Sequence, residues 1–291
     1  MKNKNMKMIL LFLVPVALLY FFFFIYPLGF VLTTSLMKWN GISAMKFVKF
    51  DNYIKLFSDE TFQLSIKNNI IWALCGGFIQ IPLATLIALI LARQPFGWRT
   101  LRTIFFLPNI ISAVAIAMMW KAIYNPMYGF LNSFLALFGN EGHNWLGEIG
   151  TALPSIITQQ VLYIGYFMII ILAATTTIPK SFYEAAKIDG AGVFQQEWYI
   201  TLPMIRGILV TTITLAMAYG MRHFEATFLM TNGGPAHSTS VMGLILYHKM
   251  DAFRYGEANA TGTILIFLGT LVIVFIRKIL SRTDAGADSV Q

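Results

Sequence analysis

The chain has 291 residues, of which 57% are hydrophobic and only 12% are charged, and its mean hydropathy is +0.67. Soluble globular domains carry about 25% charged residues, so lipid must surround most of this chain. The single cysteine, Cys75, excludes an internal disulfide framework and a cysteine-rich metal site. The net charge of +8 does not indicate nucleic-acid binding, because the basic residues are scattered around hydrophobic segments.

Six stretches are long and apolar enough to cross a membrane as helices. Spanning the ~30 Å hydrocarbon core takes about 20 apolar residues, and a helix satisfies its own backbone groups there. The stretches are Met8–Leu36, Ile70–Ala92, Ile104–Tyr124, Ala152–Thr175, Met204–Met230 and Ala258–Ile276. The first is too long for a signal-peptide core and lacks a small-x-small cleavage site, so we expect it to be retained. The sequence therefore predicts an all-α integral membrane protein of six transmembrane helices, locally kinked or broken at Pro15, Pro27 and Pro82.

Lysine and arginine fall mainly in alternate connections, as expected when short cytoplasmic loops retain positive charge. Each predicted inner segment holds three of them: Lys2, Lys4 and Lys7; Arg93, Arg99 and Arg102; Lys180, Lys187 and Arg206; Arg277, Lys278 and Arg282. The connection from Asn125 to Gly150 has none, although four lysines between Lys38 and Lys55 weaken the contrast. We expect both termini to lie in the cytoplasm.

The connection between the fourth and fifth stretches carries helix start and stop signals. Ser181 and Glu184 have the spacing of a capping box, in which each side chain satisfies an orphan amide at a helix start. Gly190 suits the left-handed conformation that follows a last helical turn. We expect a short helix from about Phe182 to Asp189, a sharp turn, and a second short helix that ends before Pro203. The capping box alone predicts no more than a well-capped interfacial hairpin.

The string Glu184-Ala185-Ala186, followed by Asp189-Gly190-Ala191 and a later Leu202-Pro203, resembles the signature loop of ATP-binding-cassette (ABC) importer permeases. In that family a coupling helix inserts into a groove of a separate ATPase subunit. The matching ATPase-coupling residues here are Glu184, Ala185, Ala186, Asp189, Gly190 and Ala191. The resemblance implies the type I ABC importer permease fold with a cytoplasmic coupling helix. It implies a single transmembrane permease domain over 1–291, with core helices at about 66–280 and a coupling hairpin at about 179–203.

Two further segments resemble carbohydrate importers related to the larger membrane subunit of the maltose system. One contains Asp51-Asn52-Tyr53 and Asn68-Asn69; the other runs from Thr231-Asn232-Gly233-Gly234-Pro235 to Gly256. The second begins with turn chemistry, in which glycines supply positive φ and proline ends the helix. The resemblance implies one permease subunit of a binding-protein-dependent sugar importer, with an oligosaccharide as the expected substrate.

No Gly-Lys pair occurs in the sequence, so the glycine-rich phosphate-binding loop used in ATP hydrolysis is absent. We therefore expect the chain not to be catalytic and to bind no cofactor, with ATP and Mg used by a partner ATPase. The implied partners are two cytoplasmic ABC ATPase subunits, a second permease subunit in a heterodimer, and an extracytoplasmic sugar-binding protein. The implied location is a bacterial inner (plasma) membrane.

The fifth stretch contains Arg222, His223 and Glu225, and charges at membrane depth are costly unless they face a cavity or a partner. Two interpretations remain open. In the first, Arg222 and Glu225 share a helix face and neutralise each other, while His223 hydrogen-bonds a neighbouring helix. In the second, the three groups line an aqueous cavity that holds sugar hydroxyls.

The family resemblance places substrate contacts on the same stretch and on the fourth. Counting back from the turn at 231–235 gives Ala216, Tyr219, Gly220, His223 and Glu225, and counting back from Ile178-Pro179 gives Leu162, Tyr163 and Tyr166. The predicted substrate-binding residues are Tyr163, Tyr166, Tyr219, Gly220, Arg222, His223 and Glu225. A tyrosine ring covers an apolar sugar face while its hydroxyl hydrogen-bonds, although Tyr163 and Tyr166 could instead pack in the bundle.

Other functions are open to the same sequence. An ion-coupled secondary sugar transporter would place its ionisable relay in the fifth stretch, but it would not need the Glu-Ala-Ala loop. The same ABC role could serve an anionic sugar or a glycerol-phosphate-type substrate. A membrane-embedded enzyme is disfavoured because the sequence has no His-Glu-x-x-His and no nucleophile motif. A passive channel is disfavoured because no selectivity ring is evident.

Overall fold

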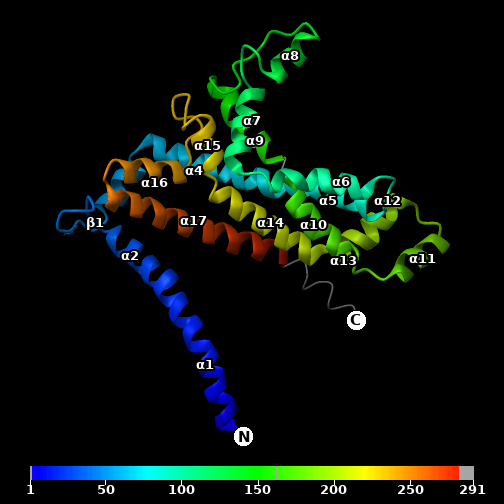
Figure 1. Ribbon diagram of the computed structural model, residues 1–291, viewed down its shortest axis with the longest axis horizontal. Helices are drawn as coiled ribbons and strands as arrows, with labels where there is room; N and C mark the ends of the chain where they lie inside the picture. The colour runs from blue at the N-terminus through cyan, green and yellow to red at the C-terminus, as the bar shows by residue number, and fades with distance from the viewer. Residues whose placement is uncertain (1, 162, 282–291) are drawn as a thin grey trace. The chain divides into compact units, whose positions relative to one another are not determined.

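The computed structural model describes residues 2–161 and 163–281. In that part of the chain nearly all regular structure is helical (Figure 1), apart from one antiparallel pair of short strands, β1 (Met37–Lys38) and β2 (Lys46–Phe47). The chain forms two compact units. The first contains the N-terminal segment up to Gln63 together with Ile245–Ile266, and the second contains Leu64–Leu244 and the segment from Phe267 onward.

The first unit is held together by buried polar contacts. Its elements are α1 (Lys2–Tyr20), η1 (Phe21–Ile25), α2 (Tyr26–Thr34), the strand pair, α3 (Asp51–Phe57), most of α16 (Met242–Asp251) and the start of α17 (Tyr255–Ser281). The buried Asn52 amide donates to the Ser35 and Met37 carbonyls at 2.8 and 2.9 Å. Glu257, which is 9% exposed, accepts from Lys249 and Arg254. These contacts tie the connection after α2 to α3 and close the corner between α16 and α17.

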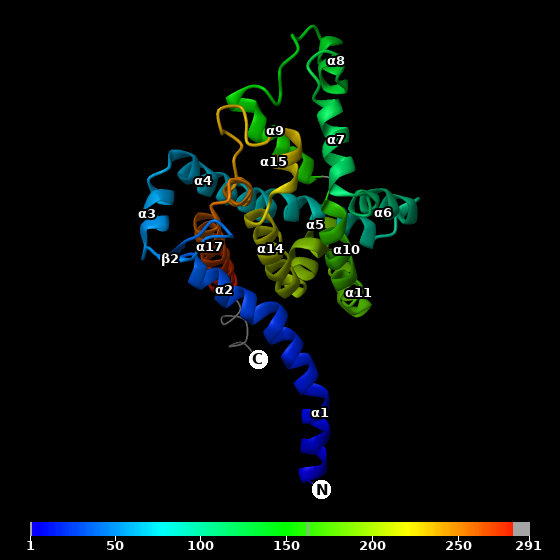
Figure 2. The same ribbon diagram turned by 60° about the vertical axis from the view of Figure 1, so that its left-hand side comes forward.

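The second unit contains the remaining helices. They are most of α4 (Glu60–Cys75), η2 (Gly76–Gln80), α5 (Ile81–Ala92), α6 (Trp98–Phe106), η3 (Leu107–Asn109), α7 (Ala113–Ile123), α8 (Phe130–Ala136), α9 (Ile149–Val161), α10 (Ile164–Thr175), α11 (Lys180–Ile188), α12 (Val193–Gln196), η4 (Glu197–Thr201), α13 (Leu202–Met204), α14 (Arg206–Met221) and α15 (Glu225–Met230). Its core lies where α5 packs along α10, with α14 beside them (Figures 1 and 2). Small residues on α5, such as Ala84 and Ala88, face Met168 and Ile171 of α10, which lets the two helices approach closely.

Three π-helical turns, η1, η2 and η4, are each followed two residues later by a proline: Pro27, Pro82 and Pro203. Proline lacks a backbone N–H, and its ring would clash with the carbonyl four residues earlier in a regular α-helix. The wider π turn relieves both problems, so the helix continues. The expected helix end before Pro203 is therefore wrong, because the helical segment runs through Pro203 to Met204.

Three helical stretches are long and apolar enough to cross a membrane: Leu11–Thr34, Glu60–Ala92 and Tyr255–Leu280. Within the described residues, three bent pairs raise the number to 6 if each counts as one span. The pairs are Trp98–Asn109 with Ala113–Ile123, Ile149–Gln160 with Ile164–Thr175, and Val193–Met204 with Arg206–Met230. The first pair is bent by 97° and the last by 73°. These segments overlap the six stretches predicted from hydropathy, which gave no sign of bends this sharp.

Candidate functional site

The fifth predicted stretch is broken inside the membrane-spanning segment. Helix α14 ends at Met221 and α15 begins at Glu225, so Arg222 and Glu225 do not share the helix face that the first of the two interpretations requires. The buried side chain of Asn69 on α4 stabilises the break: its Nδ2 donates to the Met221 carbonyl at 2.8 Å, and its Oδ1 accepts from the Met242 N–H at 2.7 Å. Among the described residues, no salt bridge joins Arg222 to Glu225, and the neutralising pair is not formed.

A cavity of about 640 Å³ opens beside this break, and we call it the polar cavity. Residues from α4, η2, η3, α7, α9, α10 and the turn before it, α14, the break and the start of α15 contribute to its wall. They are Trp72, Gln80, Asn109, Ala113, Gln159, Gln160, Tyr163, Tyr166, Phe167, Tyr219, Arg222, His223, Phe224, Glu225 and Ala226. The wall combines aromatic rings with amides and one residue of each charge. Such a surface suits a ligand that has both C–H faces and hydroxyl groups.

Six of the seven predicted substrate-binding residues line the polar cavity. Tyr166 and Tyr219 stand edge to face with ring centroids 6.4 Å apart, and both are substantially exposed, at 42% and 50%. The Arg222 guanidinium lies 5.6 Å from the centroid of the Tyr219 ring. Tyr163 precedes α10 and is half-buried, while Glu225 is exposed at the first turn of α15.

Gly220, the seventh residue, does not line the polar cavity. A Cβ atom there would lie 2.7 Å from the Ala73 Cα and the Trp72 carbonyl carbon, so this glycine permits close contact between α14 and α4. Ala216 is likewise buried in the helix packing. Leu162, which the family comparison also indicated, lies outside the described residues.

Among the described residues, four buried polar atoms in the wall of the polar cavity have no hydrogen-bond partner: Trp72 Nε1, Gln159 Oε1, Gln160 Oε1 and His223 Nε2. The first interpretation had His223 hydrogen-bond a neighbouring helix, and its Nε2 makes no such bond to the described residues; its ring stacks on that of Trp72, with centroids 3.7 Å apart. An unpaired buried polar group costs ~1–3 kcal/mol, so a ligand that satisfies these groups gains that energy.

Sequence reasoning missed the amides of the polar cavity. The Gln160 amide donates to Gln80 Oε1 at 3.0 Å, and the Gln80 amide donates to the Gln160 carbonyl at 3.1 Å, which joins α9 to η2. The available signal was the presence of amide side chains inside otherwise apolar stretches. Because an apolar environment favours amides that are paired or face a cavity, Gln80, Gln159 and Gln160 could have been singled out.

The hairpin at 179–203 contains α11, α12, η4 and part of α13. Helix α11 begins at Lys180 with Pro179 as its N-cap and no side-chain capping bond, so the Ser181–Glu184 capping box is wrong. Ser181 is already inside the first turn, where its hydroxyl is not placed to cap. The predicted stop is confirmed: Gly190 has φ +78°, and the Ala191 N–H donates to the Ala186 carbonyl at 2.8 Å, which completes a Schellman motif.

The two halves of the hairpin are bonded to each other. The Tyr183 hydroxyl and the Thr201 hydroxyl lie 2.9 Å apart, and the Gln196 amide donates to the Ala191 carbonyl at 2.9 Å. Of the predicted ATPase-coupling residues, four are exposed and two are half-buried: Glu184, Ala185, Asp189 and Gly190, then Ala186 and Ala191. The hairpin thus exposes the end of α11 and the turn that follows it, and these hydrogen bonds hold its two halves together.

The predicted turn after α15 is also observed. Asn232 and Gly233 have φ values of 49° and 88°. Asn68, next to Asn69 on α4, donates to the Ser238 and Ser240 carbonyls at 2.9 and 2.8 Å. Adjacent asparagines on α4 therefore fix both the break before α15 and the loop after it.

Several apolar spans, a polar cavity beside a broken helix and a capped hairpin between two spans define a polytopic membrane permease. The family of binding-protein-dependent transport system inner membrane components matches residues 80–283, and the chain belongs to this family. The resemblance found in the Glu-Ala-Ala loop is thereby confirmed. Membership makes the chain a membrane-spanning transport component, whereas the cytoplasmic placement of its termini stays a prediction.

Several bacterial relatives match over nearly the full chain. The probable ABC transporter permease protein YurN of Bacillus subtilis is 34% identical, covering 92% of this chain and 94% of that protein. The diacetylchitobiose uptake system permease protein NgcF of Streptomyces coelicolor is 31% identical, covering 94% and 82%. The lactose transport system permease protein LacF of Rhizobium radiobacter is 30% identical, covering 94% and 93%.

A solved structure shares the fold. It is a bacterial ABC transporter involved in the import of the acidic polysaccharide alginate, and its matching chain has a TM-score of 0.84 at 23% identity, with 96% of this chain and 98% of that chain covered. A bacterial alginate ABC transporter in complex with an alginate pentasaccharide-bound periplasmic protein gives a TM-score of 0.86 at 22% identity, with 97% and 96% covered. The predicted type I ABC importer permease fold is confirmed.

Proposed function

We propose that this chain is a membrane-spanning permease subunit of an ATP-driven, binding-protein-dependent importer of oligosaccharides, and that it forms half of the translocation pathway. The relatives support a sugar, since their names include diacetylchitobiose, trehalose/maltose and lactose transport. The observation that carries the proposal is the polar cavity, whose wall contains two tyrosines that meet edge to face and two glutamines, Gln159 and Gln160, with unpaired oxygens.

The substrate-binding residues of this proposal are those that line the polar cavity. Tyr166 and Tyr219 cover apolar faces of sugar rings, and Tyr163 adds a hydroxyl. The unpaired Gln159 and Gln160 oxygens accept from sugar hydroxyls, while the Trp72 N–H donates to them. Arg222 and Glu225 bring opposite charges to the same wall, which favours a neutral sugar over a uronate or a glycerol-phosphate-type substrate.

The geometry of the hairpin at 179–203 is the evidence for the ATPase partners in this proposal. A short helix that ends in an exposed Schellman turn is a compact projection, and Glu184 and Asp189 lie exposed on it. We propose that one of the two cytoplasmic ABC ATPases of the assembly docks here, and that the pair uses ATP and Mg and pulls the hairpin as it closes. A second permease subunit and an extracytoplasmic sugar-binding protein complete the assembly. In this arrangement the chain itself is not catalytic and binds no cofactor.

The test uses the complex that co-purifies with this chain from its native membrane, with its subunits identified by mass. Reconstituted in liposomes with ATP at the ATPase side, it should take up a labelled oligosaccharide from a panel delivered by its binding protein. His223→Ala and Tyr166→Ala should abolish uptake while leaving assembly intact. Tyr128→Ala is the matched control, because Tyr128 is 71% exposed and does not line the polar cavity.

Two outcomes would overturn the proposal. The first is uptake driven by a proton or sodium gradient without any nucleotide-cleaving subunit, which would favour the ion-coupled transporter. The second is unchanged transport in both cavity variants, which would remove the polar cavity from the pathway.

A further inference from the structure

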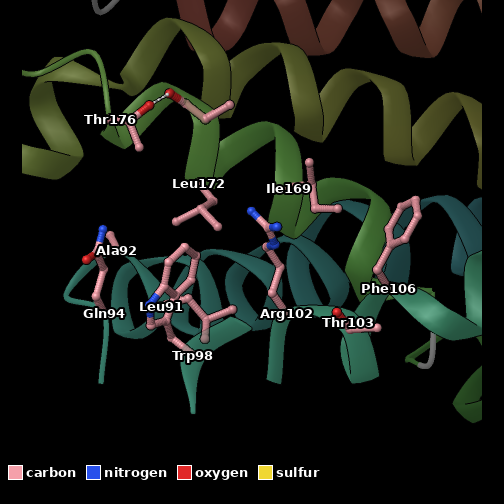
Figure 3. Close-up of a pocket in the computed structure, with 11 residues that line it drawn as sticks. Leu91, Ala92, Gln94, Trp98, Arg102, Thr103, Phe106, Ile169, Leu172 and Thr176 are labelled. Carbon is pink, nitrogen blue, oxygen red and sulfur yellow. Dashed lines mark hydrogen bonds between the residues drawn. The ribbon is translucent and has the colours of Figure 1, made fainter. Parts of the chain in front are cut away.

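A second cavity, of about 540 Å³, lies between the end of α5, helix α6 and helix α10, and we call it the α6–α10 groove (Figure 3). Its wall consists of Leu91, Ala92, Gln94, Trp98, Arg102, Thr103, Phe106, Ile169, Leu172, Ala173 and Thr176. None of these residues lines the polar cavity. Most of the wall is aliphatic or aromatic. In Figure 3 Gln94 lies at one end of the groove, and Arg102 and Thr103 lie further along it.

Arg102 places a positive charge in the α6–α10 groove. Figure 3 shows its side chain rising from α6 toward α10, with the guanidinium between the Leu172 and Ile169 side chains. The guanidinium carbon lies 5.4 Å from the centroid of the Trp98 ring, and that of Arg99 lies 5.6 Å from the same ring. Among the described residues, neither arginine has a carboxylate in salt-bridge distance, whereas Arg93 is paired with Glu197.

Helix α6 has the properties of a helix that lies at a membrane surface. Its sequence, Trp-Arg-Thr-Leu-Arg-Thr-Ile-Phe-Phe, spaces Arg99 and Arg102 three residues apart among apolar residues. The segment is bent by 97° from the span that begins at Ala113, so both cannot follow the membrane normal. Tryptophan and arginine together are typical of the level of the lipid head groups. The loop that contains Arg93, Arg99 and Arg102 is one of the basic segments predicted to face the cytoplasm.

We propose that the α6–α10 groove binds an anionic phospholipid of the inner leaflet. The phosphate is held by Arg102, with Arg99 adding charge nearby, because a planar guanidinium bonds phosphate oxygens in pairs. One acyl chain lies against Leu91, Phe106 and Leu172. Basic pockets between transmembrane helices on the cytoplasmic side are typical sites for anionic head groups.

The bound lipid would brace the helix that leads into the hairpin at 179–203. Ala173 and Thr176 of the groove lie just before α11, which begins at Lys180. A lipid wedged between α6 and α10 would therefore hold the start of the hairpin at a fixed distance from α6. Transport should accordingly depend on anionic lipid. This dependence follows from the groove alone and should hold whichever substrate is transported.

The experiment counts lipids on the assembled transporter. The purified complex is placed in phosphatidylcholine nanodiscs with or without phosphatidylglycerol, and native mass spectrometry counts the phosphatidylglycerol that remains bound. Arg102→Gln should weaken retention about fivefold, the equivalent of ~1 kcal/mol per basic residue near an anionic surface. Ala173→Trp should displace the acyl chain without changing charge. The matched control is Arg277→Gln, because Arg277 is exposed and lies outside the groove.

Three results would overturn the proposal. Equal loss of bound phosphatidylglycerol in the Arg102 and Arg277 variants would mean that basic residues attract anionic lipid to the surface in general. Complete displacement of the lipid by millimolar inorganic phosphate would mean a simple anion site with no acyl-chain contact. Phosphatidylglycerol retention no greater than that of phosphatidylcholine in the assembled complex would mean that the groove does not select an anionic head group.

Discussion

Arg93 and Glu197, more than one hundred positions apart in the sequence, form a salt bridge of 2.6 Å between the end of α5 and the hairpin at 179–203. Arg93 Nε also donates to the same carboxylate oxygen at 2.8 Å, and its Nη2 donates to the Val193 carbonyl at 3.3 Å. The Glu197 side chain is only 16% exposed. Because α5 packs along α10, this bridge connects the hairpin to the core of the second unit.

We predict that Arg93→Glu uncouples ATP hydrolysis from sugar uptake, because two carboxylates then face each other where the hairpin meets α5. Leaving Glu197 unpaired should also lower stability by ~1–2 kcal/mol. The number of sugars transported per ATP and the melting temperature of the complex measure the two effects. The double variant Arg93→Glu/Glu197→Arg restores opposite charges and should recover coupling. Failure of the exchange to recover coupling would contradict a role for the bridge.

Gly190 is predicted to act through its backbone conformation. A Cβ atom added at this residue would meet no described atom within 4 Å, but φ is +78°. Gly190→Ala should cost ~1 kcal/mol in the turn and lower the sugars transported per ATP, whereas Gly190→Asn should be milder, because asparagine tolerates the left-handed region. Equal defects in both variants would point to direct crowding of a docked ATPase instead.

A substitution at Gly220 tests whether this residue serves helix packing or contacts the substrate. Gly220→Ala adds a Cβ atom 2.7 Å from the Ala73 Cα on α4, and overpacking of this kind costs ~1–3 kcal/mol. We expect a lower melting temperature and a lower yield of assembled complex. Gly207→Ala is the control on the same helix α14, because its Cβ meets nothing within 4 Å. Normal stability of Gly220→Ala with loss of transport alone would restore this glycine to the substrate-binding set.

The elements that sequence predicted correctly are those determined by neighbouring residues. The apolar spans, the Gly190 stop and the turn at Asn232-Gly233 each depend on local composition or on a residue that tolerates positive φ. The break after Met221 depends on Asn69 of α4, far away in the sequence, and no local pattern shows such a bond. The Gln80–Gln160 pair was missed for the same reason, because it exists only where η2 and α9 meet.

The last prediction concerns the break itself. Asn69→Leu leaves the Met221 carbonyl and the Met242 N–H without their buried partner, which should cost ~1–3 kcal/mol for each group. The same change removes the restraint that places Arg222 and His223 at the polar cavity. We therefore expect both a lower melting temperature and a loss of transport per assembled complex.

The matched control is the adjacent Asn68→Leu, which removes two bonds of similar length, to the Ser238 and Ser240 carbonyls, in the loop after α15. Its destabilisation should be comparable, since both asparagine side chains are buried and each loses two hydrogen bonds. Its transport per assembled complex should fall less, because the polar cavity contains neither Ser238 nor Ser240. Identical transport loss at equal stability would show that the break does not position the cavity residues, and that Asn69 acts only through overall stability.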